Sequence, residues 1–166
     1  MKKHYLGLIA LLGITLAVAC KKDKDEEVPY DEVKQAAIDE QTIKDYIAAN
    51  NITGMQRDTT GVYWKVLQNG INEDTIALDD RFNISYKGWL LNGTRFDSAN
   101  NTTFNDIRLG STGLIAGFKV GPQKTSKKGV VQYLIPSVLG YRNRQQGSIP
   151  PNSVLKFEVT VNDFYY

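Results

Sequence analysis

The sequence predicts an α+β fold, in which a curved antiparallel sheet folds over one short helix and a helical segment precedes the sheet. Three observations support this prediction. Several segments after residue 61 alternate apolar and polar residues with a period of two. One short stretch between them has helical spacing, and residues 31–50 have a weaker helical period. The 166 residues, of which 42% are hydrophobic, suffice for one domain with appendages.

The first nineteen residues have the pattern of a lipoprotein signal peptide. A basic start, MKKH, precedes an uncharged run of roughly 14 residues, which is shorter than the ~20 that a membrane-spanning helix needs. Small residues then precede Cys20, as in a bacterial lipobox, whose cysteine is lipidated and becomes the new N-terminus. Ala17 stands where Leu, Val or Ile is commoner, so the alternative is plain secretion with a free thiol at Cys20.

Residues 20–30 are expected to form a charged tether. The run KKDKDEE at 21–27 cannot pack in a core, so we expect it to be solvated. An acidic run at this place is either a simple spacer or a signal for export to the cell surface.

Residues 31–60 are expected to form a helical preface. Val33, Ala36 and Ala37 follow a weak helical period. Thr42 is expected to cap a second helical stretch, and a break is expected from Gly54 to Thr60.

Residues 61–166 are expected to form the globular domain. Strands are predicted at 62–67, 81–90, 129–136 and 155–162. The dipeptide Asn92-Gly93 predicts a hairpin between Leu91 and Thr94. The short helix is predicted at 113–120, with Ser111 or Thr112 as its cap.

The composition excludes several classes of function. The net charge of +2 falls to about zero once Lys2 and Lys3 leave with the signal peptide, which argues against a nucleic-acid partner. Cys20 is the single cysteine and His4 the single histidine. We therefore expect no metal site, no cofactor and none of the Ser-His or Cys-His pairs of common acyl-transfer enzymes.

Five short motifs follow one another between residues 85 and 159. They are SYKG at 85–88, NGTRFDS at 92–98, LIAGF at 114–118, LIPSVLGY at 134–141 and IPPNSVLKFEV at 149–159. In this order and spacing they resemble the motifs of the FKBP-type peptidyl-prolyl cis-trans isomerases: Y-x-G, G-x-x-F-D-S, V-I-x-G-W, I-P-x-x-x-A-Y and I-P-P-N-x-x-L-x-F-x-V. The resemblance covers about residues 61–164 and implies an FKBP-like fold, and the lipoprotein leader resembles that of envelope members.

The resemblance also implies a set of site residues. Those of the catalytic centre are Tyr86, Phe96, Asp97 and Tyr141, and those that bind substrate are Leu114, Ile115, Phe118, Ile149 and Phe157. Phe104 is a further candidate for the wall of the pocket. Without the resemblance, the local sequence would indicate that the apolar members are ordinary core residues. It would also indicate that Asp97 caps a turn.

The chain departs from the family pattern at several positions. Phe118 replaces the usual tryptophan and so lacks an indole N–H, Val138 replaces a common acidic residue, and Arg142 replaces a glycine. The segment 121–129 is longer and more basic than is typical. These departures leave the pocket walls intact and bear on rate and sequence preference.

The residue types suit rotation of an X-Pro bond, whose barrier is about 18–20 kcal/mol for a peptide bond. A catalyst of this rotation needs no nucleophile or metal, but must favour the twisted bond over the planar one. Aromatic walls can receive the proline ring, and the Tyr141 hydroxyl or the Ile115 N–H can hold a substrate carbonyl. Asp97 either acts electrostatically near that carbonyl or orients Tyr86.

The resemblance thus implies an isomerase, and the lipobox-like residues before Cys20 predict a lipid anchor at the outer membrane of a bacterial cell envelope. We expect the protein to be a monomer. Its substrates would be proline-containing unfolded or exported polypeptides. One alternative is a non-catalytic FKBP-like chaperone or peptide-binding lipoprotein. Another is a β-rich surface lipoprotein that captures nutrients or glycans through exposed aromatic residues such as Trp89.

Overall fold

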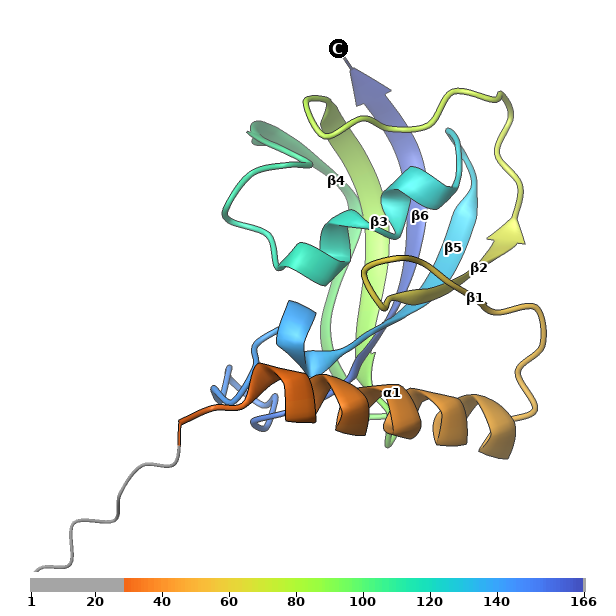
Figure 1. Ribbon diagram of the computed structural model, residues 1–166. Coiled ribbons are helices and arrows are strands. Elements are labelled where there is room, and N and C mark those ends of the chain that lie inside the picture. Colours follow the sequence, from red (N-terminus) through yellow and green to blue (C-terminus); the bar gives the residue numbers. More distant parts are fainter. Residues whose placement is uncertain (1–28, 166) are drawn as a thin grey trace, which may run out of the picture.

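The computed structural model describes residues 29–165 (Figure 1). The predicted signal peptide, Cys20 and most of the charged tether lie outside these residues, as does the side chain of Phe104. The elements in chain order are α1 Glu32–Ala49, β1 Gln56–Arg57, β2 Tyr63–Gln68, β3 Arg81–Leu90, β4 Arg95–Arg108, the 3-10 turns η1 Ala116–Lys119 and η2 Pro122–Lys124, β5 Val130–Ile135, the 3-10 turn η3 Ser137–Leu139, and β6 Leu155–Tyr165.

The six strands form one antiparallel sheet in the order β1-β2-β5-β6-β3-β4. The predicted hairpin is confirmed, because the Leu90 N–H donates to the Thr94 carbonyl at 2.9 Å and closes the β3–β4 turn. Gly93 has a φ of +90°, which a glycine adopts without strain. The predicted α+β class with a preceding helix is therefore confirmed.

The strand β6 shows why the alternation predicts the sheet correctly. Leu155, Phe157, Val159 and Val161 are all buried, and the residues between them are partly exposed. Because strand side chains alternate between faces, these four residues lie on one face of the sheet. The turns η1 and η2 cover that face (Figure 1).

The helix predicted at 113–120 is wrong in type and length. The structure has a 3-10 turn of four residues, Ala116–Lys119, whose N-cap is Ile115 and not Ser111 or Thr112. A segment this short cannot offset the cost of nucleating an α-helix, and 3-10 turns serve in short connections. Gly117 lets the turn approach the sheet, since a Cβ there would lie 2.1 Å from Cγ2 of Ile135.

The preface is one continuous helix and not two stretches. Asp31 is its N-cap and accepts the Lys34 N–H at 2.9 Å. Thr42 caps nothing, because its hydroxyl lies inside the helix and donates to the Ile38 carbonyl at 2.8 Å. The expected break at 54–60 contains the short strand β1, which pairs with β2. Across residues 29–165 no helix has both the length and the apolar character needed to span a membrane.

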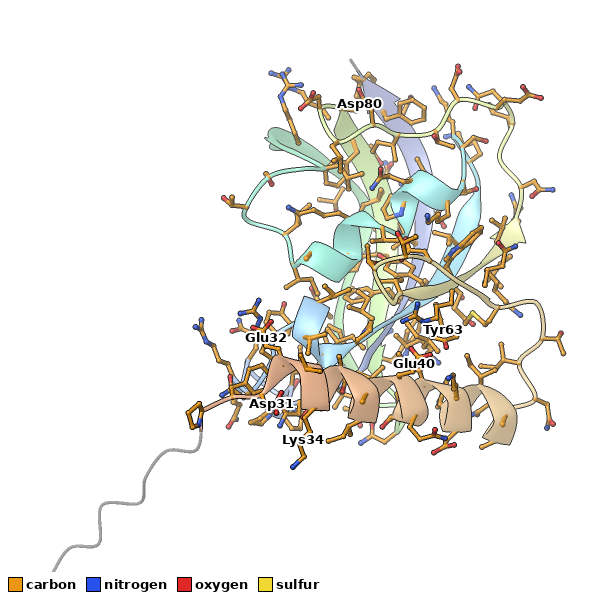
Figure 2. The ribbon with its side chains drawn as sticks, viewed as in Figure 1. Asp31, Glu32, Lys34, Glu40, Tyr63 and Asp80 are labelled. Carbon is orange, nitrogen blue, oxygen red and sulfur yellow. The ribbon has the colours of Figure 1, made fainter. Side chains whose placement is uncertain are left out.

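The helix α1 packs across one end of the sheet (Figure 1). Its Ile43 side chain joins Tyr63, Leu134 and Val154 in a second small core. Glu40 ties the helix to the sheet, since its carboxylate accepts the Tyr63 hydroxyl at 2.7 Å and the Arg57 Nε–H at 3.0 Å. Figure 2 shows Glu40 and Tyr63 pointing toward each other from α1 and β2.

The Glu40 contacts make stability depend on pH. Burial raises the pKa of Glu40, but hydrogen bonds from Tyr63, Arg57 and Lys44 outweigh burial and lower the pKa from 4.5 to about 2. A carboxylate whose pKa is lower in the folded state stabilises the fold above its unfolded pKa. That stabilisation is lost as the pH falls from about 4.5 toward 2.

We therefore expect Glu40→Gln to lower the free energy of unfolding at pH 7 and to flatten its decline between pH 5 and pH 3. Urea melts at pH 7, 5 and 3 measure this. Asp45→Asn is the matched control, because Asp45 is an exposed carboxylate on the same helix that accepts only from Gln41 within the described residues. Parallel pH curves for the parent and Glu40→Gln would contradict the assignment.

Candidate active site

Aromatic side chains from four strands and one 3-10 turn meet on the covered face of the sheet. We call Tyr86, Phe96, Phe118, Tyr133 and Phe157 the aromatic cluster. The ring centroid of Phe157 lies 5.2 Å from that of Phe118, 5.5 Å from Phe96, 5.8 Å from Tyr133 and 6.2 Å from Tyr86. These separations are those of favourable edge-to-face and offset ring pairs. Phe157 is therefore the centre of the cluster.

The cluster changes from buried to half-exposed across its width. Phe118, Tyr133 and Phe157 are buried, with Phe157 only 5% exposed, whereas Tyr86 and Phe96 are half-buried. The first three rings therefore form a floor and the other two a rim that solvent reaches.

Gly88 lets two rings of the cluster approach the backbone of β3. A Cβ atom at this position would lie 2.7 Å from Cζ of Phe96 and 2.9 Å from Cε1 of Phe157, closer than van der Waals contact allows. The motif Tyr86-x-Gly88 therefore has a steric cause: the tyrosine supplies one ring, and the glycine leaves room for two others.

Tyr133 is a floor residue that the sequence analysis missed. Its ring stacks on Phe157 with an interplanar angle of 20°, and its hydroxyl donates to the Phe118 carbonyl at 3.3 Å. Burial raises the pKa of Tyr133 well above its ordinary value, so the hydroxyl stays protonated. The signal for it was present, because Tyr133 alternates with Val131 and Ile135 on a predicted strand.

Tyr86 and Asp97 form a polar pair at the rim. The Tyr86 hydroxyl donates to Oδ2 of Asp97 at 2.8 Å, and the Ser98 N–H donates to Oδ1 at 2.8 Å. Burial, and then the Asp97 carboxylate, raise the pKa of Tyr86. The sequence analysis gave two structural roles for Asp97, orienting Tyr86 and capping the local backbone, and Asp97 makes the contacts of both.

Tyr141 reaches the same rim from the loop that follows η3. It is half-buried and packs against the core that includes the aromatic cluster. Burial, and then the negative charge of Asp97, raise the pKa of Tyr141. Its hydroxyl therefore remains a hydrogen-bond donor at neutral pH.

The remaining predicted residues border the cluster from two loops. Leu114 and Ile115 precede η1 and pack, partly buried, against the same core, as does the buried Ile149. Within residues 29–165 no acceptor is found for the Ile115 N–H. The structure therefore brings together all nine predicted pocket residues, eight through one apolar core and Asp97 through its bond to Tyr86.

Comparison with known proteins identifies the family to which this chain belongs. The model of the family described as FKBP-type peptidyl-prolyl cis-trans isomerase matches residues 73–162, which is more than half of the chain. The chain belongs to the FKBP-type peptidyl-prolyl cis-trans isomerase family.

Three curated relatives show the extent of the similarity. FkpA of Escherichia coli strain K12 is 30% identical over 115 residues, which are 66% of this chain and 40% of that protein. A probable FKBP-type isomerase of Haemophilus influenzae is 36% identical over 63% of this chain and 43% of that protein. The chain thus spans less than half the length of these two FKBP-type relatives. An FK506-binding protein of Neisseria meningitidis is 35% identical over 60% of this chain and 92% of that protein.

Solved structures agree with the FKBP-type assignment. The crystal structure of FkpA from Escherichia coli aligns with a TM-score of 0.65 at 30% identity, over 80% of this chain and 62% of that chain. An isomerase structure from Pseudomonas syringae aligns with a TM-score of 0.65 at 22% identity, over 79% of this chain and 96% of that chain. The second likeness concerns the fold alone.

Three of the departures from the FKBP pattern have a structural context, whereas nothing in the structure explains Val138. Phe118 keeps the ring contact of a floor residue, with a centroid 5.2 Å from that of Phe157, although it brings no N–H donor. Arg142 has a φ of +57°, a left-handed conformation that suits glycine and costs other residues about 1–2 kcal/mol. The basic segment 121–129 is largely neutralised, since Lys124 pairs with Asp58 at 3.3 Å and Lys127 pairs with an aspartate of β6 at 2.6 Å.

Trp89, the exposed aromatic residue of the glycan-binding alternative, is less exposed than that alternative expects. Its side chain is only partly exposed, and Nζ of Lys156 lies 5.0 Å from its ring centroid. The face of this indole is therefore occupied by a neighbouring cation.

Two hollows lie near the candidate site. One of about 390 Å³ adjoins Tyr141 and is lined by Ala116 and by residues of 138–146. Another of about 620 Å³ touches Tyr86 but is lined mainly by residues such as Ser85, Lys87 and Glu158, which alternate with the aromatic residues along β3 and β6. It belongs to the opposite face of the sheet, and we assign the site to the aromatic face, where all the family motifs meet.

Substitutions at Phe157 and Asp97 should separate folding from chemistry. Phe157→Ala removes the central ring, so we expect a loss of about 3–5 kcal/mol in the free energy of unfolding together with a loss of activity. Asp97→Ala removes a rim contact, so we expect unfolding within about 1 kcal/mol of the parent and a loss of isomerase activity.

Denaturant melts and isomerase rates on the same preparations check both expectations. Asp97→Asn is the matched variant, because it keeps an acceptor for the Tyr86 hydroxyl and loses only the charge. An Asp97→Ala variant that is fully active but unstable would make Asp97 a structural cap. A Phe157→Ala variant as stable as the parent would remove Phe157 from the centre of the core.

Proposed function

We propose that this chain is a peptidyl-prolyl cis-trans isomerase that acts on proline-containing unfolded or exported polypeptides. One observation carries the proposal: the half-exposed rim of Tyr86, Phe96 and Tyr141 stands over a floor of buried rings. Such a site offers an apolar place for a proline ring beside a few oriented polar groups.

The floor supplies the main catalytic effect. The planar X-Pro amide is more polar than the twisted one, because twisting breaks the C–N resonance. Phe118 and Phe157 replace water with apolar rings around the bond and so disfavour its planar form. The site thus favours the transition state over the ground state, without a covalent intermediate.

The rim holds the substrate while the bond turns. The Tyr141 hydroxyl, which stays protonated at neutral pH, and the Ile115 N–H are the two donors for substrate carbonyls. The Tyr86 hydroxyl is engaged by Asp97 at 2.8 Å, so its part is to fix the carboxylate beside the rotating carbonyl.

The isomerase proposal predicts catalysis and ligand binding by the soluble fragment that starts at Asp31. We expect it to accelerate cis-trans isomerisation of a short X-Pro peptide in a protease-coupled assay. Tacrolimus or rapamycin should inhibit it, as the family resemblance implies.

An Asp45→Asn variant is the control, since Asp45 is an exposed residue of α1 outside the aromatic cluster. Binding of the macrolides without acceleration would favour the non-catalytic chaperone, in which Phe118 and Arg142 have removed turnover. Absence of both binding and acceleration would refute the isomerase proposal.

We also propose that the protein acts as a monomer in the bacterial cell envelope, lipid-anchored through Cys20 to the outer membrane. The lipobox-like residues 17–20 and the charged tether at 21–27 support the lipid anchor and the envelope location. Three acyl chains on Cys20 would hold the protein at a membrane, since two lipid signals already give stable attachment.

Anchoring makes a separate prediction about Cys20. Cys20→Ala should release the protein from the membrane fraction or leave it as an unprocessed precursor, because the lipidated thiol is gone. Cell fractionation and the size of the protein on a denaturing gel measure this, and Lys22→Ala is the control that keeps the lipobox intact. A Cys20→Ala protein with unchanged processing and attachment would show that another feature anchors the chain.

A further inference from the structure

The helix α1 contacts the loop that carries Tyr141 through a buried carboxylate. Asp39 is 1% exposed and Ser137 is fully buried, although both are polar. Oδ2 of Asp39 accepts the Ser137 hydroxyl at 2.7 Å and the Val138 N–H at 3.4 Å, and Oδ1 accepts the Gln35 side-chain amide at 2.8 Å. In Figure 1 the turn η3, which begins at Ser137, stands against the N-terminal half of α1.

Ser137 is also hydrogen-bonded to both neighbours of Tyr141. Its carbonyl accepts the Gly140 N–H at 2.9 Å and the Arg142 N–H at 2.9 Å. The two residues that flank Tyr141 are therefore bonded to Ser137, whose side chain is bonded to Asp39. A shift of Ser137 would move the backbone on both sides of the tyrosine.

Breaking the hydrogen bond between Asp39 and Ser137 would be costly in free energy. A buried carboxylate without its donors is costly, so α1 and η3 are held as a unit. A second contact joins α1 to the loop that follows η3, since Arg142 pairs with Glu32 of α1 at 3.0 Å. Both of these side chains are about half exposed, so the pair is weak, and Asp39 carries most of the connection.

We propose that Asp39 is a positioning residue, which through Ser137 sets the place of the Tyr141 hydroxyl at the rim of the aromatic site. The helix that precedes the isomerase motifs is then part of the catalytic apparatus. The catalytic side of this inference rests on the proposed function, whereas the coupling between helix and loop does not.

Adjacent residues of α1 provide a matched comparison. Asp39 contacts the loop, whereas Glu40 contacts Tyr63 and Arg57 on the sheet. In the full-length chain, Asp39→Ala should lower kcat/KM for an X-Pro peptide by about tenfold or more, since misplacing a group by about 1 Å can cost a hundredfold. Glu40→Gln should leave kcat/KM within about twofold of the parent when the two preparations contain the same fraction of folded protein. Asp39→Asn should retain most of the activity, because it keeps an acceptor for the Ser137 hydroxyl.

A double-mutant cycle tests whether Asp39 acts through Tyr141. If it does, Asp39→Ala should have little further effect in a Tyr141→Phe chain, in which the hydroxyl is absent. Effects that multiply would overturn the proposal. So would an Asp39→Ala variant as active as the parent, or a Glu40→Gln variant as inactive as Asp39→Ala.

Amide hydrogen exchange tests the coupling without any assay of activity. We expect Asp39→Ala to speed exchange at the Gly140 and Arg142 amides, and Glu40→Gln to leave them unchanged. An inactive parent that still shows this difference would refute the proposed function and leave the coupling standing. Unchanged exchange in Asp39→Ala would overturn the coupling itself.

Discussion

The contact of the Phe157 ring with four other aromatic rings is the constraint on which the remaining structure depends. It requires β3, β4 and β5 to present their rings to the same face as β6, and it requires η1 to cover them. Gly88 is a consequence of this packing, because any side chain there would meet two of the rings. The same packing leaves a rim of half-buried tyrosines above a buried floor, so one set of contacts forms both the core and the candidate site.

The parts of the fold that depend on local pattern were predictable from the sequence. The buried residues of β6 lie where the two-residue period placed them, and Asn92-Gly93 forms the predicted hairpin. The nine pocket residues also meet, although their roles in catalysis stay predictions. The motifs succeeded because each combines a turn or strand signal with a side chain of distinctive shape.

The parts that depend on contacts distant in sequence were not predictable. The helix at 113–120 is a short 3-10 turn, because close packing of Gly117 on Ile135 decides its geometry. The strand alternation places Tyr133 on the buried face, but its stacking on Phe157 depends on a residue of another strand. No local sequence pattern indicated the role of Asp39, because its partner Ser137 is 98 residues away along the chain.

The two tryptophans of the chain, Trp64 and Trp89, are not members of the aromatic cluster. Each lies beneath a lysine ammonium group, with Nζ of Lys124 5.4 Å from the ring centroid of Trp64 and Nζ of Lys156 5.0 Å from that of Trp89. Lys156 also donates to the hydroxyl of Tyr46 in α1 at 3.2 Å. We therefore expect the fluorescence of Trp89 to change when α1 leaves the sheet, because Lys156 contacts both the indole and α1. The aromatic cluster itself contains only tyrosine and phenylalanine rings, so the seating of α1 and the state of the candidate site are followed through different chromophores.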